Sequence, residues 1–261
     1  RNTFRFLLGN LSDFSPEQAV PREKMSAVDR AFLDHLDARL AKIRSDWSAL
    51  LFHKALDGVL DVCTVDLSAI YLDVSKDRLY TLMPGHAARR SAQTVLWRAL
   101  RELTLASSPA LVYTADETWQ HHPGLLAECE SVHFAEWAAN GDGSSDEWMF
   151  LREVRDVVNA AIEPLRAAKT LATTAEAEIV LTAPAAWLTR LAPYQAELES
   201  FLIVAKATLV EGAAGAEPTV EVVKSSLAKC DRCWTFRSDV AARGEAQLCS
   251  RCGEALTAQG R

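Results

Sequence analysis

The first two-thirds of the chain show the apolar spacing of amphipathic helices. Between residues 23 and 50, large apolar residues recur at steps of three and four, which places them on one helical face. The same spacing continues over residues 56–74 and again over residues 88–103. Pro84 and Gly85 separate the last two segments, because this pair interrupts helices. We therefore predict a mainly α fold that begins with an antiparallel helical bundle.

Two further helices are predicted from capping patterns. Thr114 and Glu117 have the spacing of a capping box, so we expect a helix to begin at Thr114. Ser144 and Glu147 have the same spacing at the end of a polar loop, residues 140–147, and a helical apolar pattern follows them. These patterns add two helices to the bundle.

The pattern changes towards the last third of the chain. Pro164 should kink or restart the helix in which it lies, because proline cannot donate a backbone hydrogen bond. Residues 178–183 and 201–210 are predicted strands, with a short helix between them, and residues 219–226 are a possible third strand. We predict a small α/β unit after the bundle.

Taken together, the patterns divide the chain into three domains: a helical bundle (1–170), a small α/β connecting unit (171–226) and a cysteine-containing finger (227–261). Hydrophobic residues make up 49% and charged residues 24%, which is typical of a soluble globular protein. No apolar run approaches the ~18 residues of a membrane span. The chain starts with Arg1 and has no signal peptide, so we expect it to be a piece of a longer protein.

Four cysteines near the end form two Cys-x-x-Cys pairs. They are Cys230 with Cys233 and Cys249 with Cys252, and fifteen residues separate the pairs. This spacing is typical of a zinc site, whereas redox pairs or disulfides are the alternative interpretation. Four thiolates complete a tetrahedron, so we predict one structural Zn²⁺ with no position open for catalysis. Gly253 would supply a turn with positive φ after the second pair.

The remaining reactive side chains do not suggest an active site. Cys63 lies in an apolar helical pattern and is predicted to be a buried hydrophobic residue. Asp116 and Glu117 are explained by the first turn of a helix, where carboxylates favour the helix dipole. His121 and His122 are adjacent and point in different directions, which makes a poor metal pair. We therefore predict no catalytic residues.

The net charge of −7 differs from that of a strongly basic nucleic-acid-binding domain. From Lys224 onward, however, seven Lys and Arg residues stand against four Asp and Glu. Any contact with nucleic acid must therefore depend on local arginine clusters: Arg1 with Arg5, Arg89 with Arg90, or Arg232, Arg237 and Arg251 beside the cysteines.

Several segments resemble a known family. RNTFRFLLGNLSDFSP at the start, YLDVSKDRLY at 71–80, ARRSAQTVL at 88–96 and PALVYTADETW at 109–119 are similar to the region that follows the catalytic domain in isoleucyl-tRNA synthetases. The tail CDRCWTFRSDV…LCSRCG resembles the zinc finger of the bacterial members. The block PALVYTADETW is similar in the valyl and leucyl relatives, so it indicates the class more than the amino acid. The Cys-x-x-Cys-Trp tail is what indicates isoleucine.

This resemblance implies an anticodon-binding domain followed by a tRNA-contacting extension. The partner would be isoleucine tRNA, held at its anticodon stem-loop, and the chain would be cytoplasmic and monomeric. The complete enzyme would be an ATP-dependent isoleucine–tRNA ligase, whose ATP-using catalytic domain lies upstream and is absent here. One departure is Ala172, in a loop where the family usually has glycine. The candidate tRNA-binding residues are Arg1, Asn2, Arg5, Arg89, Arg90, Arg232, Trp234 and Arg251.

Two alternatives remain open from the residues alone. Trp234 could fill the core of the finger, or it could present a flat face for a stacked nucleotide. The whole chain could instead be a stand-alone zinc-stabilised interaction module for nucleic acid or protein. A DNA glycosylase of the formamidopyrimidine type ends in a similar finger, but it needs an N-terminal proline and a following glutamate where this chain has Arg1 and Asn2.

Overall fold

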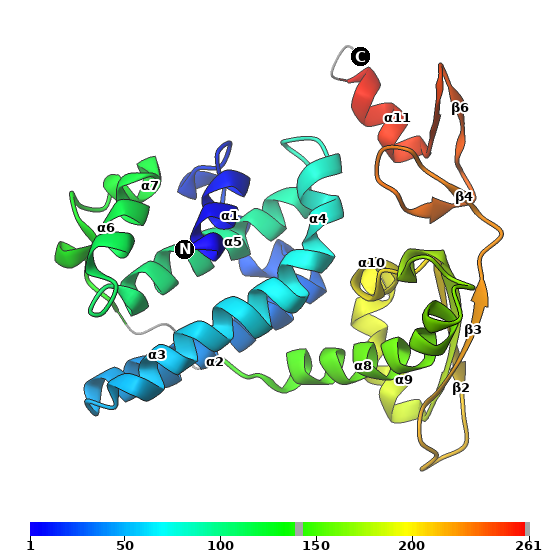
Figure 1. Ribbon diagram of the computed structural model, residues 1–261, viewed down its shortest axis with the longest axis horizontal. Coiled ribbons are helices and arrows are strands. Elements are labelled where there is room, and N and C mark those ends of the chain that lie inside the picture. The colour runs from blue at the N-terminus through cyan, green and yellow to red at the C-terminus, as the bar shows by residue number, and fades with distance from the viewer. Residues whose placement is uncertain (139–142, 259–261) are drawn as a thin grey trace. The chain divides into compact units, whose positions relative to one another are not determined.

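A computed structural model describes residues 1–138 and 143–258, which form two compact units, Arg1–Trp148 and Met149–Arg261. Helices dominate, as predicted, and a small sheet region follows (Figure 1). Four cysteines cluster near the end of the chain. The first three residues of the predicted polar loop, 140–142, lie outside the described part. The three-domain division stays a prediction. No helix within the described ranges combines the length and apolar character needed to cross a membrane.

The first unit is built from helices, and its three expected helical segments are present. Its long helices follow the predicted apolar pattern, but the helix expected to start at Thr114 begins two residues earlier, and no side chain caps it. The elements are α1 (Asn2–Asn10), η1 (Pro16–Gln18), η2 (Arg22–Lys24), α2 (Ala27–Ser48), α3 (Phe52–Asp61), η3 (Val62–Tyr71), α4 (Leu72–Thr81), α5 (Ala87–Ser107), α6 (Val112–Gln120), α7 (Pro123–Leu126), η4 (Val132–Phe134) and the start of α8 (Asp146–Ala167).

The second predicted helix is one continuous rod, α3–η3–α4, whose middle segment is a π-helix. Its buried residues are Val62, Asp66, Leu67 and Tyr71. Val62 and Leu67 are five positions apart, as are Asp66 and Tyr71, which suits the wider π turn. Helix α2 lies beside this rod (Figure 1). The rod ends at Leu82, directly before Pro84 and Gly85, as the sequence predicts.

A buried carboxylate joins four elements of the bundle. Asp29, in the first turn of α2, is fully buried and accepts two hydrogen bonds of 2.8 Å from the guanidinium of Arg78 in α4. It also accepts from the Ser91 hydroxyl of α5 at 2.6 Å and from the Tyr71 hydroxyl of η3 at 2.8 Å. Burial alone would raise the pKa of Asp29, but the charge and hydrogen bonds of Arg78 outweigh it and lower this pKa.

Aromatic packing continues from this carboxylate into the core. Phe32, one turn after Asp29, stacks on Tyr71 with ring centroids 4.1 Å apart. The edge of Trp148 meets Phe32 at 4.8 Å, so the first turn of α8 belongs to the bundle core. Ser144 helps to start α8, because its hydroxyl accepts a hydrogen bond from the Asp146 amide at 3.1 Å.

The second unit contains the sheet and the finger. Strand β1 (Ala177–Ala183) is central, with β2 (Lys206–Glu211) parallel on one side and β3 (Thr219–Lys224) antiparallel on the other. A parallel pair needs a crossover, and the crossover is helical, so helices lie against one face of the sheet (Figure 1). The other elements are η5 (Thr174–Glu176), α9 (Ala185–Leu191), η6 (Ala192–Glu197), α10 (Leu198–Leu202), β4 (Ala228–Lys229), β5 (Phe236–Arg237), β6 (Ala241–Arg243), β7 (Ala246–Leu248) and α11 (Ser250–Thr257).

The strand predicted over 201–210 is wrong in its first part. Phe201 and Leu202 belong to α10 and are buried, and the strand begins only at Lys206. Ile203 ends the helix with a left-handed backbone, φ 55°. A continuous apolar run cannot by itself distinguish a buried helical turn from a strand, and the packing of α10 decides here.

Two expectations concern the end of α8. The helix does not restart at Pro164 and continues to Ala167, because the proline lies in the last turn and a single missing hydrogen bond does not end it. The left-handed residue of the following turn is Lys169, with φ 57°, and not Ala172. The amide of Thr170 reaches back to the Leu165 carbonyl at 2.9 Å, which is the hydrogen bond of a Schellman motif. Ala172 therefore carries no positive-φ strain.

We predict that Asp29→Asn lowers the free energy of unfolding of the bundle by about 3 to 5 kcal/mol at pH 7, because it leaves the Arg78 charge buried without a carboxylate partner. Urea denaturation followed by circular dichroism measures this loss. Since the pKa of Asp29 is lowered in the folded state, its contribution is present above the unfolded carboxyl pKa of about 3.9 and is lost as the pH falls through the folded pKa.

Asp73→Asn is the matched control, because Asp73 pairs with Lys76 on the surface of α4 at 3.0 Å. Its expected cost is below about 0.5 kcal/mol. Equal losses for the two variants at pH 7 would contradict a special role for the buried carboxylate.

Candidate metal centre and nucleic-acid interface

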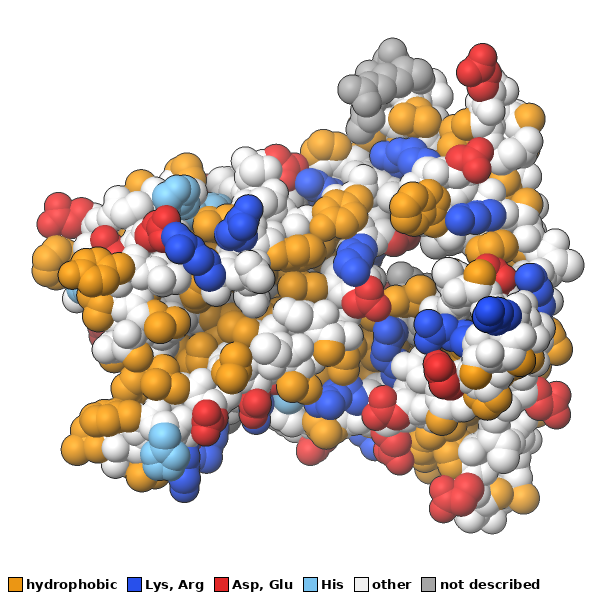
Figure 2. Space-filling view, in the orientation of Figure 1, with side chains coloured by type: hydrophobic (Ala, Val, Ile, Leu, Met, Phe, Trp, Pro, Cys, Tyr) orange, Lys and Arg blue, Asp and Glu red, His pale blue; other side chains and the backbone are white. Residues whose placement is uncertain are grey.

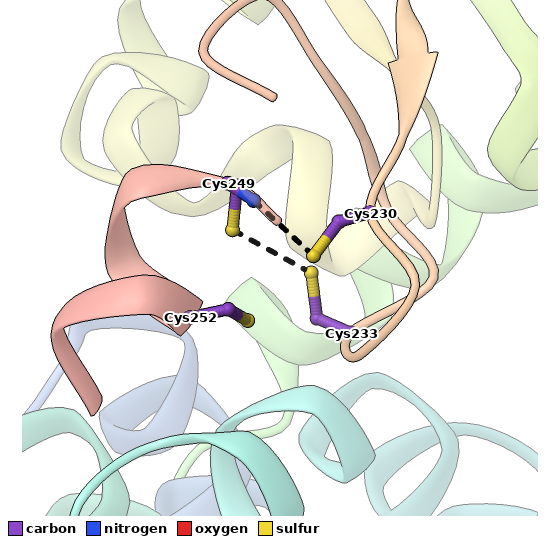
Figure 3. A group of neighbouring side chains, drawn as sticks. All are labelled: Cys230, Cys233, Cys249 and Cys252. Atoms are coloured by element: carbon purple, nitrogen blue, oxygen red, sulfur yellow. Dashed lines mark hydrogen bonds between the residues drawn. The ribbon is translucent and has the colours of Figure 1, made fainter. Parts of the chain in front are cut away.

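The four predicted cysteines lie together in the finger. One ligand atom from each of Cys230, Cys233, Cys249 and Cys252 can be chosen so that all lie within 4.8 Å of one another, a group that could hold a metal ion. In Figure 3 the two pairs face one another, and the sulfur atoms of Cys233 and Cys249 are 3.9 Å apart. A tetrahedral ion with metal–sulfur bonds of about 2.3 Å needs sulfur atoms roughly 3.8 Å apart. The donor set therefore fits such an ion.

Local structure explains how each pair reaches the centre. Cys230 and Cys233 lie in the turn between β4 and β5, where the Cys230 amide donates to the Thr235 carbonyl at 3.0 Å. Cys249 directly precedes α11, and Cys252 lies in its first turn. A hairpin turn and a helix N-terminus thus each present two thiols at a spacing of three residues.

The surroundings of the sulfur atoms differ between the pairs. Burial raises the pKa of the Cys230 thiol, but backbone hydrogen bonds from Cys233, Cys249 and Arg232 outweigh it and lower this pKa to about 6. Burial raises the pKa of Cys252 to about 12 and also raises that of Cys249. Because thiolates are the metal-binding form, binding must remove protons from the second pair.

The cysteines are also most of the finger's core. Three of them are buried with Leu248. Within residues 227–258, the partly buried hydrophobic side chains packed against this group are Cys233, Val240, Ala246 and Leu256. Gly253 does not form the predicted positive-φ turn, since it lies inside α11. Its missing side chain leaves space for Arg243, because a Cβ there would lie 2.6 Å from the guanidinium.

Trp234 does not fill this core. Its side chain is 68% exposed, although it directly follows Cys233. Its backbone is left-handed, with φ 61°, and its amide donates to the Cys230 carbonyl at 2.9 Å. The core interpretation is therefore wrong, and the indole is available at the surface of the finger.

The arginines beside the cysteines are less free than the sequence suggests. The guanidinium of Arg232 lies 3.6 Å from the Cys252 sulfur, so it supports a candidate metal ligand. Arg237 donates to the Thr235 hydroxyl at 3.1 Å. Arg251, in the first turn of α11, is half-buried. Replacing Arg232 would therefore change the cysteine cluster as well as any contact with nucleic acid.

Arg89 and Arg90 are engaged within the bundle. Arg89 forms a bidentate ion pair with Asp13, with distances of 2.6 and 3.0 Å, and its side chain is 14% exposed. Arg90 donates to the Asp13 carbonyl at 2.8 Å and to Gln93 at 2.7 Å. Both therefore hold the segment after α1, and this structural role leaves little of either guanidinium for a ligand.

Arg1 and Arg5 line a pocket of about 510 Å³ between α1 and α6. Arg1 is ion-paired with Glu117 at 2.7 Å, whereas Arg5 is exposed and makes no side-chain hydrogen bond or ion pair within the described ranges. Asn2 is exposed at the first position of α1. The complete lining is Arg1, Phe4, Arg5, Leu8, Thr114, Glu117, Thr118 and His121. The pocket thus combines an apolar wall with an unpaired cation.

Charges of both signs are interspersed over the face of the molecule in Figure 2. This agrees with the net charge of −7 and with the expectation that any nucleic-acid contact is local. Of the candidate residues, Arg5 in the first unit is an uncommitted cation within the described ranges, and Trp234 in the second unit is an exposed aromatic residue.

The fold also brings together a buried Ser–His–Asp group that no sequence pattern indicated. His35 lies 2.9 Å from the Ser145 hydroxyl and 3.1 Å from the Asp66 carboxylate. The group links α2 and η3 to the segment before α8. It does not face solvent, because the imidazole is 5% exposed. Only the fold brings these three distant positions together. Of the other groups considered, His122 is buried and Cys63 is half-buried.

Comparisons with known proteins agree with the family resemblance. Residues 29–181 match the family model described as the anticodon-binding domain of tRNA ligase. The isoleucine–tRNA ligase of Chromobacterium violaceum is 40% identical over 268 residues, which cover all of this chain and 29% of that protein. The ligase of Neisseria gonorrhoeae (strain NCCP11945) is 40% identical over 272 residues, and that of Laribacter hongkongensis is 37% identical over 268. Each alignment covers the whole chain, which spans less than a third of these relatives.

We predict that removal of the metal with a chelator unfolds the chain from about Lys229 onward and leaves the helices of Arg1–Trp148 folded, because the finger has almost no core apart from its cysteines. Limited proteolysis with mass spectrometry locates the unfolded segment, and circular dichroism reports the helices. Cys252→Ser should act like the chelator, whereas Cys63→Ser should not. A single transition that melts both units together would contradict the prediction.

Proposed function

This chain belongs to the family of anticodon-binding domains of tRNA ligases, and on that premise we propose that it is the tRNA-binding part of an isoleucine–tRNA ligase. The observation that carries the proposal is the family match over residues 29–181. The relatives that align with the whole chain are isoleucine–tRNA ligases, which supports isoleucine tRNA as its partner.

The proposal assigns binding, and not chemistry, to this chain. The complete ligase would join isoleucine to its tRNA with ATP, and the ATP-using domain would lie in the part of the relatives that this chain does not cover. The residues here would hold and identify the tRNA. We further propose a monomer that acts in the cytoplasm, where a reducing environment keeps cysteines available for a metal.

We propose that the four cysteines hold one structural Zn²⁺. Four sulfur donors at tetrahedral spacing favour zinc over magnesium or calcium, which prefer oxygen. Cys230, Cys233, Cys249 and Cys252 would close the coordination sphere, and the metal would supply only rigidity to the finger. The hydrogen bonds from Arg232 and from the Cys249 amide to cysteine sulfur atoms support a thiolate-rich site.

The pocket between α1 and α6 is the first proposed contact with the anticodon loop. Its size suits one unpaired nucleotide, whose base would pack against Phe4 and Leu8. Arg5 would contact a phosphate, since its charge is uncommitted. Asn2 and Arg1 flank this position, and the ion pair with Glu117 orients the Arg1 guanidinium.

The second proposed contact is the exposed face of Trp234. An aromatic ring held at the surface gives an unpaired base a stacking partner without much loss of side-chain freedom. Each contact belongs to a different compact unit, and each can be tested separately.

We predict that the zinc-loaded chain binds isoleucine tRNA more tightly than other tRNAs and than duplex DNA in a filter-binding assay at a stated salt concentration. This preference follows if the interface reads unpaired anticodon bases and does not only attract phosphates. Equal affinity for all three would contradict the proposal and would favour a general interaction module.

The two contacts should respond differently to substitution. Arg5→Ala should weaken binding of isoleucine tRNA and reduce the slope of log affinity against log salt by roughly 0.7–0.9, the value for one lost phosphate contact. Trp234→Ala should cost about 1–3 kcal/mol of binding free energy through lost stacking and leave that slope unchanged. Lys206→Gln is the control, since it removes an exposed charge from β2, which belongs to neither proposed contact, and binding should stay within about two-fold of wild type. A salt slope unchanged by Arg5→Ala would remove Arg5 from the interface.

A further inference from the structure

The backbone around Trp234 is arranged in a way that the sequence does not reveal. Trp234 occupies the left-handed region, which is unfavourable for a bulky aromatic residue and persists only where the surrounding structure holds it. The hydrogen bond from its amide to the Cys230 carbonyl provides this restraint. The turn that carries Cys230 and Cys233 thus determines the direction in which the indole leaves the backbone.

The edge of the indole is held as well. Its Nε1–H donates to the Asp231 carbonyl at 3.1 Å. Asp231 is itself bound twice to β7: its amide donates to the Gln247 carbonyl at 2.8 Å, and its carboxylate accepts from the Gln247 amide at 2.7 Å. The residue whose carbonyl holds the indole is therefore bound to β7, which lies next to the second pair of cysteines.

One face of the indole is partly occupied by a cation. The ammonium of Lys229 lies over the ring, 5.6 Å from the ring centroid. Lys229 is the last residue of β4, and its backbone pairs with Phe236 of β5, so its side chain starts from a fixed strand. Lys229 forms no ion pair with a carboxylate in the described ranges. Trp234 as a whole is 68% exposed, so much of the ring remains accessible beside Lys229.

From this geometry we propose that Lys229 and Asp231 are positioning residues for Trp234. They hold the indole at one angle with a single open face, so that it is ready to stack on one unpaired base of an RNA. The proposal rests on the proposed function for its ligand. Lys229 acts through the ring and does not itself contact a phosphate, which distinguishes it from Arg5.

The orientation can be tested without RNA. The zinc-loaded 261-residue chain is labelled with 5-fluorotryptophan, and Trp234→Phe identifies the ¹⁹F signal of this position. Lys229→Gln should shift and narrow the signal, because the ring loses its cation and moves more freely. Lys229→Arg should restore the wild-type signal, since a guanidinium also binds over an aromatic face. An unchanged ¹⁹F signal in Lys229→Gln would overturn the positioning role.

Binding of isoleucine tRNA supplies the second arm, as a double-mutant cycle. Lys229→Gln should weaken binding about two- to five-fold, as expected for a lost cation–π contact, and should have no further effect in a Trp234→Ala background. The salt slope should not change. A loss that persists without Trp234, or a reduced slope, would identify Lys229 as a phosphate contact and overturn the proposal.

Two controls separate the possible failures. Lys206→Gln removes an exposed charge from β2 of the same unit and should leave binding within about two-fold of wild type. Zinc content of each variant, measured in parallel, shows that the finger is intact. If Trp234→Ala leaves tRNA affinity unchanged, the proposed stacking contact fails, while the ¹⁹F signal still decides whether Lys229 positions the ring.

Discussion

The bundle depends on one buried ion pair, that between Asp29 and Arg78. A carboxylate without access to water is stable only if its hydrogen bonds are complete, and Asp29 obtains them from α4, η3 and α5 together. This requirement places three elements around the first turn of α2. Helix α5 in turn contacts both α1 and α6, the two walls of the pocket that Arg1 and Arg5 line. A polar contact in the core therefore supports the geometry of a surface site.

The finger has a different constraint, which is its size. A unit of about thirty residues cannot bury enough apolar surface to be stable alone. Here the sulfur atoms take the central place, and the hydrophobic side chains around them are few. This explains why Trp234 can be spared from the core and why an arginine, Arg243, packs over Gly253. The proposed metal would hold the backbone that presents the tryptophan.

If this acidic protein binds RNA as proposed, it must use its cations selectively. Most of the candidate arginines are committed inside the structure: Arg89 and Arg90 to Asp13, and Arg232 to a cysteine sulfur. Arg5 and the Lys229–Trp234 pair remain for a ligand. Recognition through a few local contacts would make binding depend on unpaired bases more than on total charge, which suits an anticodon loop better than a duplex.

Hydrophobic periodicity predicted the long helices and the central strand, and the Cys-x-x-Cys spacing predicted the four-cysteine group, because these depend on the local spacing of residue types. The start of α6, the helical turn at Phe201 and the continuation of α8 through Pro164 did not follow from it, since packing overrides weak local preferences. The roles of the arginines and the exposure of Trp234 required the tertiary structure. A charge or an aromatic ring has the same sequence signature whether it is paired, buried or free, and only its neighbours in space decide which.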